Sequence, residues 1–248
     1  MLLQLSTWPE VEAYLARSTG IVVPVGSTEQ HGPNGVIGTD AICAEAVARG
    51  VGERAGAMVA PTFNVGMAQH HLAFPGSITL RPSTMVAALC DWVNSLARNG
   101  FARFLFVNGH GGNIAPVTTA FSEVYAQSSL RGPGNGAAVA CRLVNWWQGP
   151  RVAALSRELY GDKEGMHATP SEVAVTQYLH AEAIRDVPLE PEVAPAGSFF
   201  DAEDYRRRYP DGRIGSAPGL ATPEAGGRLL AAAVDEIAAV YRAFLAAA

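Results

Sequence analysis

The sequence predicts an α/β protein, built as a three-layer α/β/α sandwich with a mainly parallel central sheet. Short apolar runs bounded by glycine alternate along the chain with longer segments of helical periodicity. These runs are continuously apolar, which is typical of strands that are covered on both faces. The chain has 248 residues, of which 48% are hydrophobic and 17% charged, enough for one domain over residues 1–248 with a sizeable core.

Four apolar runs are expected to form the sheet. The clearest are residues 20–26 and 101–109, which are rich in aliphatic and aromatic side chains and end at glycine. Residues 57–65 and 137–147 have the same character in a weaker form.

Five segments between and after these runs are expected to be helices. They share apolar positions at helical spacing, and several begin at a capping residue or proline and end at glycine. They are residues 39–56, 81–100, 115–129, 169–183 and 222–248. Thr39 or Asp40 is a suitable N-cap for the first of them.

Two segments are expected to be irregular. Residues 131–137, "RGPGNGA", are predicted to be a surface loop. Residues 186–221 are rich in proline, glycine and charge. We interpret them as an irregular excursion rather than a linker, because only one helix follows them.

Composition excludes several classes of partner. The net charge of −5 provides no basic surface for nucleic acid or an anionic membrane. No apolar stretch approaches the roughly 20 residues of a membrane span, and the N-terminus lacks the pattern of a signal peptide. The cysteines Cys43, Cys90 and Cys141 are widely spaced and form no CxxC motif. We therefore expect a cytoplasmic protein whose partner is a small molecule.

The first motif with chemical content is "GSTEQHG", residues 26–32, directly after an apolar run. In an extended chain Glu29 and His31 point to the same side, while Gln30 points away. Asp40 follows after a glycine-rich loop that could fold it back toward them. Carboxylates and imidazoles of this kind suit Zn, Mn or Fe. A polar turn with Asp40 as a helix cap is the alternative interpretation.

The second motif is "NGHGGN", residues 108–113, where another apolar run ends. His110 is expected at the carboxyl edge of the sheet, and Gly111, Gly112 and Asn113 could donate hydrogen bonds to an oxyanion. The motif lacks the ending of a P-loop, but a phosphate nest at the following helix is a second possibility. An ordinary glycine-rich turn is the third.

Further candidates lie in two later loops. In "AQHHLAFPGS" either His70 or His71 could line a pocket, which Ser77 and the preceding Pro-Gly turn would help to shape. In "EGMHATPSE" His167 is a candidate proton shuttle, and Glu172 falls in the first turn of a predicted helix. A structural loop histidine and a carboxylate complementing the helix dipole are the alternative interpretations.

Two tryptophans, Trp146 and Trp147, end the last predicted strand. They are either core residues or a surface on which a flat substrate stacks. His180 lies within a helical pattern, and we assign it no role.

Taken together, three carboxylates and three histidines fall at strand ends or helix starts. Open α/β folds bind ligands at the carboxyl ends of their strands, so these side chains are expected to converge. The set is Glu29, His31, Asp40, His110, His167 and Glu172. Two-metal hydrolases need such an inventory, because one carboxylate bridges the ions, histidines bind each ion, and a further group moves protons.

These motifs, in this order over most of residues 20–180, resemble the creatininase family of metal-dependent amidohydrolases. The resemblance rests on "VPVGSTEQHGP", "GTD", "FPGSITL", "NGHGGN" and "EGMHATPSE". It implies an α/β/α fold, a homo-oligomer that is usually a hexamer, and two divalent ions per chain, with Zn preferred and Mn or Fe as alternatives.

The resemblance also implies roles for individual residues. Glu29, His31, Asp40 and His110 match metal ligands, and Asp40 matches the one that bridges the ions. The remaining matches concern the substrate: His167 matches a histidine near the scissile group, and Trp146 matches a tryptophan that closes over the substrate ring.

One position departs from creatininase proper, which carries a glutamate ligand two residues after the matching histidine. That position is Gly112 here, so Glu172 is the candidate that completes the second ion or acts as the acid and base. The departure weakens the case for creatinine itself as substrate.

The expected function is therefore hydrolysis of a non-peptide C–N bond by metal-activated water, with a cyclic amide, creatinine-like compound or formamide as substrate. Two alternatives stay open. One is a phosphate- or nucleotide-binding protein that uses the "NGHGGN" turn, and the other is a metal-free scaffold that keeps the fold.

Overall fold

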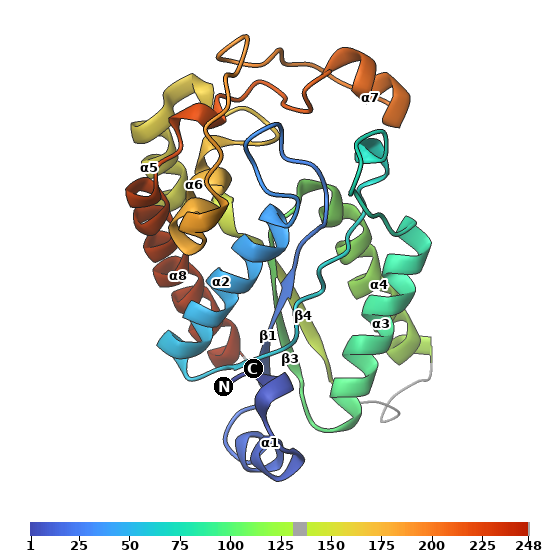
Figure 1. Ribbon diagram of the computed structural model, residues 1–248. Coiled ribbons are helices and arrows are strands. Elements are labelled where there is room, and N and C mark those ends of the chain that lie inside the picture. The colour runs from blue at the N-terminus through green and yellow to red at the C-terminus, as the bar shows by residue number, and fades with distance from the viewer. Residues whose placement is uncertain (131–137, 248) are drawn as a thin grey trace.

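The computed structural model describes residues 1–130 and 138–247 (Figure 1). The predicted surface loop 131–137, and with it the first residue of the predicted strand 137–147, lies outside the described residues.

The centre of the molecule is a four-stranded parallel sheet with the order β2-β1-β3-β4. Its strands are β1 (Gly20–Val25), β2 (Met58–Val59), β3 (Arg103–Asn108) and β4 (Ala140–Asn145). Two of them, β1 and β3, coincide with the strongest apolar runs, which confirms the predicted α/β class.

Helices surround this sheet, and most of them cover its two faces. They are α1 (Trp8–Leu15), α2 (Thr39–Ala55), α3 (Pro82–Arg98), α4 (Ile114–Leu130), α5 (Pro150–Tyr160), α6 (Pro170–Leu179), α7 (Ala202–Arg208) and α8 (Pro223–Ala246). The five predicted helices correspond to α2, α3, α4, α6 and α8. Among the described helices, none combines the length and the apolar character that crossing a membrane requires.

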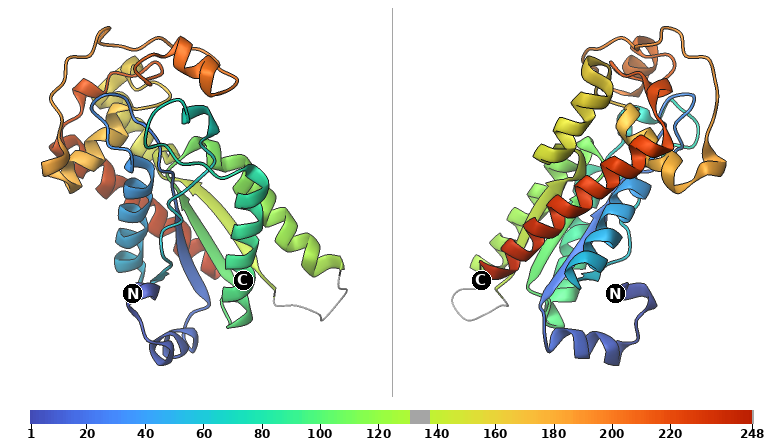
Figure 2. Two further views of the ribbon diagram at one scale, coloured as in Figure 1. Left: turned by 45° about the vertical axis from the view of Figure 1, so that its right-hand side comes forward. Right: turned by 90° about the vertical axis from the view of Figure 1, so that its left-hand side faces the viewer.

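The three layers follow from the alternation of side chains along the strands. In β1, Ile21 and Val23 pack with residues of α1, α3 and α4, whereas Val22 packs with residues of α2, α5, α6 and α8. Figures 1 and 2 show α3 and α4 on one side of the sheet and α2, α5, α6 and α8 on the other, with α1 below the amino ends of the strands. Both faces of the strand are buried, which explains its unbroken apolar sequence.

The structure corrects several sequence predictions. Only Met58–Val59 of the run 57–65 pairs as a strand, and the chain beyond it adds an isolated bridge between Val25 and Phe63. Trp146–Gln148 forms a 3-10 turn after β4 rather than the end of the strand. The helices α1, α5 and α7 were not predicted, and α7 lies inside the excursion 186–221.

The strands end at one level, which brings their loops together. Val25 pairs with Asn108, and Asn108 pairs with Asn145. The chain leaves the sheet from these three residues toward the same side. Residues 186–221, called the strap below, cross above this edge of the sheet (Figure 1).

Candidate metal centre

The loop after β1 turns Glu29 and His31 into the space above the sheet. The Glu29 backbone N–H donates to the carbonyl of Ile37 at 2.9 Å, and a bridge between His31 and Gly35 closes the turn. Both residues are buried: Glu29 is 0% exposed and His31 is 1% exposed. The sequence prediction that this pair faces one site is consistent with this placement.

Asp40 reaches the same space because α2 begins unusually close to the end of β3. A Cβ atom at Gly109 would lie 2.1 Å from the backbone oxygen of Asp40, so only glycine permits this approach. Asp40 stands in the first turn of α2, whose N-cap is Gly38. The prediction of Thr39 or Asp40 as the N-cap is therefore wrong by one or two residues.

Three side chains form a first cluster beneath the loops. Nδ1 of His110 lies 3.1 Å from Oε1 of Glu29 and 3.2 Å from Oδ2 of Asp40. One ligand atom from each of the three residues lies within 4.8 Å of the others. This is the spacing of groups that surround one cation.

A second cluster shares Asp40 with the first. Nε2 of His31 lies 3.1 Å from Oδ1 of Asp40 and 3.8 Å from Oε1 of Glu172. Its ligand atoms also lie within 4.8 Å of one another. The two oxygens of Asp40 therefore face different clusters, as a bridging carboxylate must.

Glu172 and His167 come from the turn before α6. The Glu172 carboxylate accepts a hydrogen bond from the Thr169 backbone N–H at 2.6 Å, so it caps the helix while it faces His31. Ala168 has a φ of +52°, a conformation that non-glycine residues seldom adopt. This turn directs His167 inward, where its Nδ1 lies 3.7 Å from Oε1 of Glu29.

Backbone carbonyls orient two of the rings for metal binding. Nδ1 of His31 lies 3.1 Å from the carbonyl oxygen of Glu29, and Nε2 of His110 lies 3.1 Å from that of Met67. A ring nitrogen that donates to a carbonyl leaves the other nitrogen free for a metal ion. In both rings the free nitrogen is the one that faces Asp40.

Two carboxylate oxygens in the centre lack an aligned hydrogen-bond donor. They are Oε1 of Glu29 and Oδ2 of Asp40, both fully buried. Unsatisfied buried carboxylate oxygens are costly, and a cation is the usual compensation. The chemistry of the donors, imidazole nitrogen with carboxylate oxygen, suits Zn, Mn or Fe. The residues present therefore fit a divalent metal centre.

The carboxylates raise the pKa values of the two imidazoles. Burial by itself lowers the pKa of His31, but Asp40 and then the other carboxylates outweigh it and raise the pKa to about 10. Burial also opposes the charge on His110, and Glu29 and Asp40 outweigh it to raise its pKa well above the ordinary value. Without a metal ion, each ring is therefore protonated at neutral pH.

His167 and Glu172 shift in the sense that favours their neutral forms. Burial, with the neighbouring rings of His71 and His31, lowers the pKa of His167 well below its ordinary value. Burial raises the pKa of Glu172 to about 7, and repulsion from Asp40 adds to the shift against the attraction of His31. A pKa near neutrality suits Glu172 to proton transfer.

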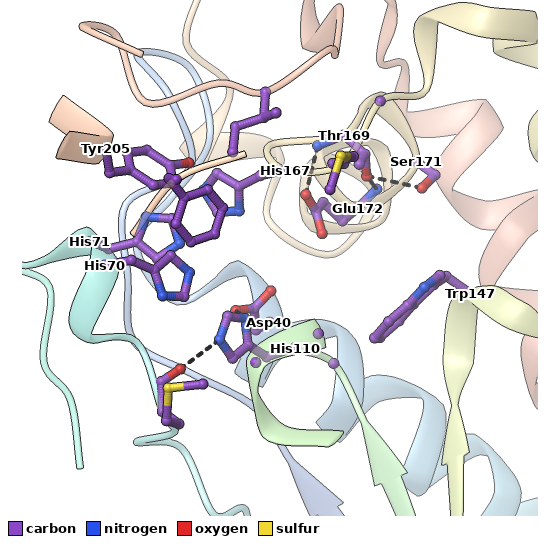
Figure 3. A pocket seen from close by; sticks show the side chains of 18 of the residues that line it. Asp40, His70, His71, His110, Trp147, His167, Thr169, Ser171, Glu172 and Tyr205 are labelled. Atoms are coloured by element: carbon purple, nitrogen blue, oxygen red, sulfur yellow. Dashed lines mark hydrogen bonds and ion pairs between the residues drawn. The ribbon is translucent and has the colours of Figure 1, made fainter. Parts of the chain in front are cut away.

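A cavity of about 440 Å³ opens above the clusters (Figure 3). Asp40, His110, His167 and Glu172 line it, whereas Glu29 and His31 lie beneath its surface. Aromatic side chains form much of its wall. They are Trp146, Trp147, Phe199 and Tyr205.

The structure places the remaining predicted substrate residues differently. Gly111 and Gly112 line the cavity, but Asn113 does not. The Asn113 amide accepts from Met67 N at 3.0 Å and donates to the Gly26 carbonyl at 2.9 Å, so it holds backbone rather than facing an oxyanion. Ser77 also lies outside the lining, and its hydroxyl accepts from the Gln30 backbone N–H at 3.1 Å.

Several contributors were missed in part from the sequence. Gln30 points away from both clusters, as expected, but it is 6% exposed and its amide reaches His71, which was not foreseen. His71, like His70, lines the cavity, and its Nε2 also lies 3.1 Å from Oε1 of Glu29. Trp146 belongs to the cavity wall but is 1% exposed and also packs in the core, while its neighbour Trp147 presents its ring to the cavity. The strap residue Tyr205 carried no signal in the sequence.

The departure at Gly112 has a direct steric cause. A Cβ atom at this position would lie 2.4 Å from Nε2 of His110 and 2.6 Å from the carbonyl oxygen of Met67. This backbone therefore has no room for a side chain at residue 112, and the second cluster takes its glutamate from α6.

Comparison with known proteins agrees with this arrangement. The family model Creatininase, described as creatinine amidohydrolase, matches residues 4–241. The creatinine amidohydrolase of Pseudomonas putida is 27% identical over 95% of this chain and 94% of its own length. The mycofactocin precursor peptide peptidase of Mycolicibacterium smegmatis is 40% identical, but over only 40% of this chain and 42% of that protein. The chain thus spans less than half the length of that peptidase.

Solved structures give the same result. A structure described as "Creatininase Mn" superposes with a TM-score of 0.81 at 26% identity and covers 98% of both chains. A mutant creatininase described as "Zn-Zn type" superposes with a TM-score of 0.83 at 25% identity over the same share. The motifs, the sheet, the buried clusters and these matches lead to one conclusion: the chain belongs to the creatininase family.

Proposed function

We propose that this protein is a metal-dependent hydrolase of a C–N bond other than a peptide bond, acting on an amide, cyclic amide or formamide. The observation that carries the proposal is Asp40, whose two oxygens each face a separate cluster of buried nitrogen and oxygen ligands. Bridged pairs of ligand sets are the arrangement by which hydrolases hold two ions.

Glu29, Asp40 and His110 would hold one divalent ion, and His31, Asp40 and Glu172 the other. Zinc is the first candidate, with manganese or iron as alternatives, because all three accept this mixture of ligands. When bound, such ions supply Lewis acidity toward a carbonyl oxygen and lower the pKa of water.

His167 is the residue that moves the proton in this proposal. Its Nε2 lies 2.8 Å from the backbone oxygen of Gln30, to which it donates, so Nδ1 on the inner side carries no proton. Its lowered pKa keeps the ring neutral at pH 7. Nδ1 can therefore accept a proton from attacking water and return it to the leaving nitrogen.

The side chains that line the cavity bear on the phosphate-binding alternative. Asp40, Glu164 and Glu172 are the carboxylates in its lining, and no lysine or arginine is among the described residues that line it. An anionic phosphate would find no cationic side chain there. The wall containing Trp147 and Tyr205 instead provides aromatic surface for a flat or apolar group. This lining supports the hydrolase over the phosphate-binding alternative.

Elemental analysis of the wild-type protein beside His110→Ala tests the proposal. We expect about two equivalents of Zn, Mn or Fe per chain, with a lower content in the variant. A protein that binds no metal after reconstitution, and whose stability a chelator does not change, would be the scaffold alternative. The metal-loaded enzyme would then be screened with creatinine, other cyclic amides, formamides and short peptides.

Assembly and location complete the proposal. The family resemblance supports a homo-oligomer, specifically a hexamer, in the cytoplasm. Light scattering coupled to size-exclusion chromatography would measure the mass in solution, and a mass equal to one 26.0 kDa chain would contradict the assembly.

A further inference from the structure

Gln30 stands between two metal-binding residues, yet it contributes no ligand to either cluster. Its side chain is buried and turns toward His71 and the strap. The amide lies against five groups: the backbone of Gly32 and Gly212, the rings of His71 and His167, and the hydroxyl of Tyr205. These contacts suffice to decide where its hydrogen atoms point.

The orientation of the amide is fixed by two backbone groups. The Gly32 N–H can only donate, so the amide oxygen Oε1, at 2.8 Å, faces it. The Gly212 carbonyl can only accept, so the amide nitrogen Nε2, at 2.9 Å, faces that group. Exchanging the two ends of the amide would break both contacts. One of the two amide hydrogens is therefore committed to Gly212.

The second hydrogen has only one suitable acceptor among these neighbours. Nε2 of His167 lies 3.0 Å away, but that nitrogen donates its own hydrogen to the Gln30 backbone oxygen at 2.8 Å. The Tyr205 hydroxyl has lone pairs that can accept, but at 3.5 Å it is the more distant group and makes the weaker contact. Nδ1 of His71, at 2.9 Å, remains as the acceptor.

This assignment decides the tautomer of His71. An imidazole nitrogen that accepts a hydrogen bond carries no proton, so the proton of the neutral ring is on Nε2. Nε2 is the atom that lies 3.1 Å from Oε1 of Glu29. A protonated nitrogen has no lone pair for a metal ion. His71 thus approaches Glu29 more closely than His167 does and still cannot be a ligand.

We propose that Gln30 is a positioning residue: it holds His71 in the Nε2-protonated form, which keeps His71 out of the ligand set and places its N–H beside the Glu29 carboxylate, 3.1 Å from Oε1. Carboxylates that bind metal ions are commonly held by such outer partners, and losing one costs about 10- to 100-fold in metal affinity. The metal-binding part of this inference rests on the proposed function, whereas the tautomer does not.

Nitrogen-15 NMR of the metal-free protein tests the tautomer directly, with the His71 signals assigned from their loss in His71→Leu. We expect an unprotonated Nδ1 and a protonated Nε2. In Gln30→Glu the carboxylate keeps the contact to Gly32 but cannot donate, so Nδ1 should become protonated. Gln4→Glu makes the same change at an exposed position and should leave the signals unchanged. A wild-type Nδ1 that is already protonated overturns the proposal, even if the Gln30 variant does not fold.

Competition with a chelating dye, using Zn²⁺ as the probe, tests the consequence. His71→Leu should weaken Zn²⁺ binding by about 10- to 100-fold. His180→Leu, the same change at a histidine outside the site, should bind as the wild type does. Unchanged affinity in His71→Leu overturns the positioning role. A wild-type protein that binds no Zn²⁺ would contradict the proposed function instead, and the NMR experiment would still decide the tautomer.

Discussion

Nε2 of His31 lies 3.1 Å from Oδ1 of Asp40, and the two side chains expose 0% and 3% of their surface. The other nitrogen of the ring is held by the backbone carbonyl of Glu29. Whatever lies between His31 and Asp40 must therefore be positively charged, either a proton on the ring or a metal ion. Protons and metal ions compete for this position.

Metal binding should therefore release protons and strengthen as the pH rises. The pKa of His31 is raised to about 10, so below that pH the metal-free ring is charged and must lose its proton to bind. The same shift stabilises the metal-free fold below the ring's ordinary pKa of 6.5, and this stabilisation is lost as the pH rises through 10. Calorimetric titration with Zn²⁺ near pH 7.5, in buffers of different ionisation enthalpy, counts the protons. A count of zero would contradict the assignment of His31.

Substitutions of the ligands should separate the two ions. Asp40→Asn is expected to lower the content of both ions because its oxygens serve both clusters. Glu172→Gln should lower only the second, so about one equivalent of metal should remain. Asp91→Asn makes the same charge change at an exposed residue of α3 and serves as the control. Elemental analysis of the four proteins measures the effect, and equal losses in Asp40→Asn and Glu172→Gln would contradict a shared Asp40.

A methyl group at residue 112 should disturb the first cluster. In Gly112→Ala the new Cβ would fall 2.4 Å from Nε2 of His110, so the ring or the backbone must move. Overpacking of this kind costs about 1–3 kcal/mol of folding stability, and the displaced ring should also bind metal more weakly.

Gly111→Ala is the matched control, because no atom lies within 4 Å of its Cβ position. Thermal unfolding and dye competition would be run on both variants. Similar behaviour of the two would show that the approach of Met67 and His110 to residue 112 has no functional consequence.

Substitution of Asn113 tests whether its side-chain amide has a structural or a catalytic role. Asn113→Ala leaves the buried Gly26 carbonyl and Met67 N–H without their partner, which should cost about 1–3 kcal/mol of the free energy of unfolding. Asn94→Ala, which removes an exposed amide on α3, should cost much less. Urea unfolding measures both. Unchanged stability with lost activity would instead support an oxyanion-binding role for Asn113.

The sequence predicted strands best where both faces of the strand are buried. The run 20–26 is buried on both faces, and its continuous apolar sequence identifies a central strand. The run 57–65 looks similar, but only Met58 and Val59 pair with β1 as a strand and Phe63 adds an isolated bridge, because a run of apolar residues carries no information about which backbone groups find a partner. The helix α5 has ordinary boundary signals, proline at residue 150 and glycine at 161, that were overlooked.

The placement of side chains in the site was predictable where their direction follows from a strand end. Glu29, His31 and His110 leave the sheet within a few residues of their strands. The hydrogen-bond partners of Gln30 were not predictable, because alternation in an extended chain indicates the side on which a side chain lies and not the groups that it meets there. Contacts with the strap, such as Gln30 with Gly212, join residues about 180 positions apart, and local sequence patterns do not reveal them.

The common level at which Val25, Asn108 and Asn145 end their strands restricts how this chain can change in length. One residue inserted within β3 would advance the following loop by about 3.3 Å and invert the facing of every later side chain in the strand. His110 would then no longer lie near Glu29 and Asp40, although every ligand would still be present in the sequence. Insertions at the opposite ends of the strands change no such alignment. Descendants of this chain should therefore tolerate length changes at the amino ends of the strands and lose the metal centre when they occur within β1 or β3.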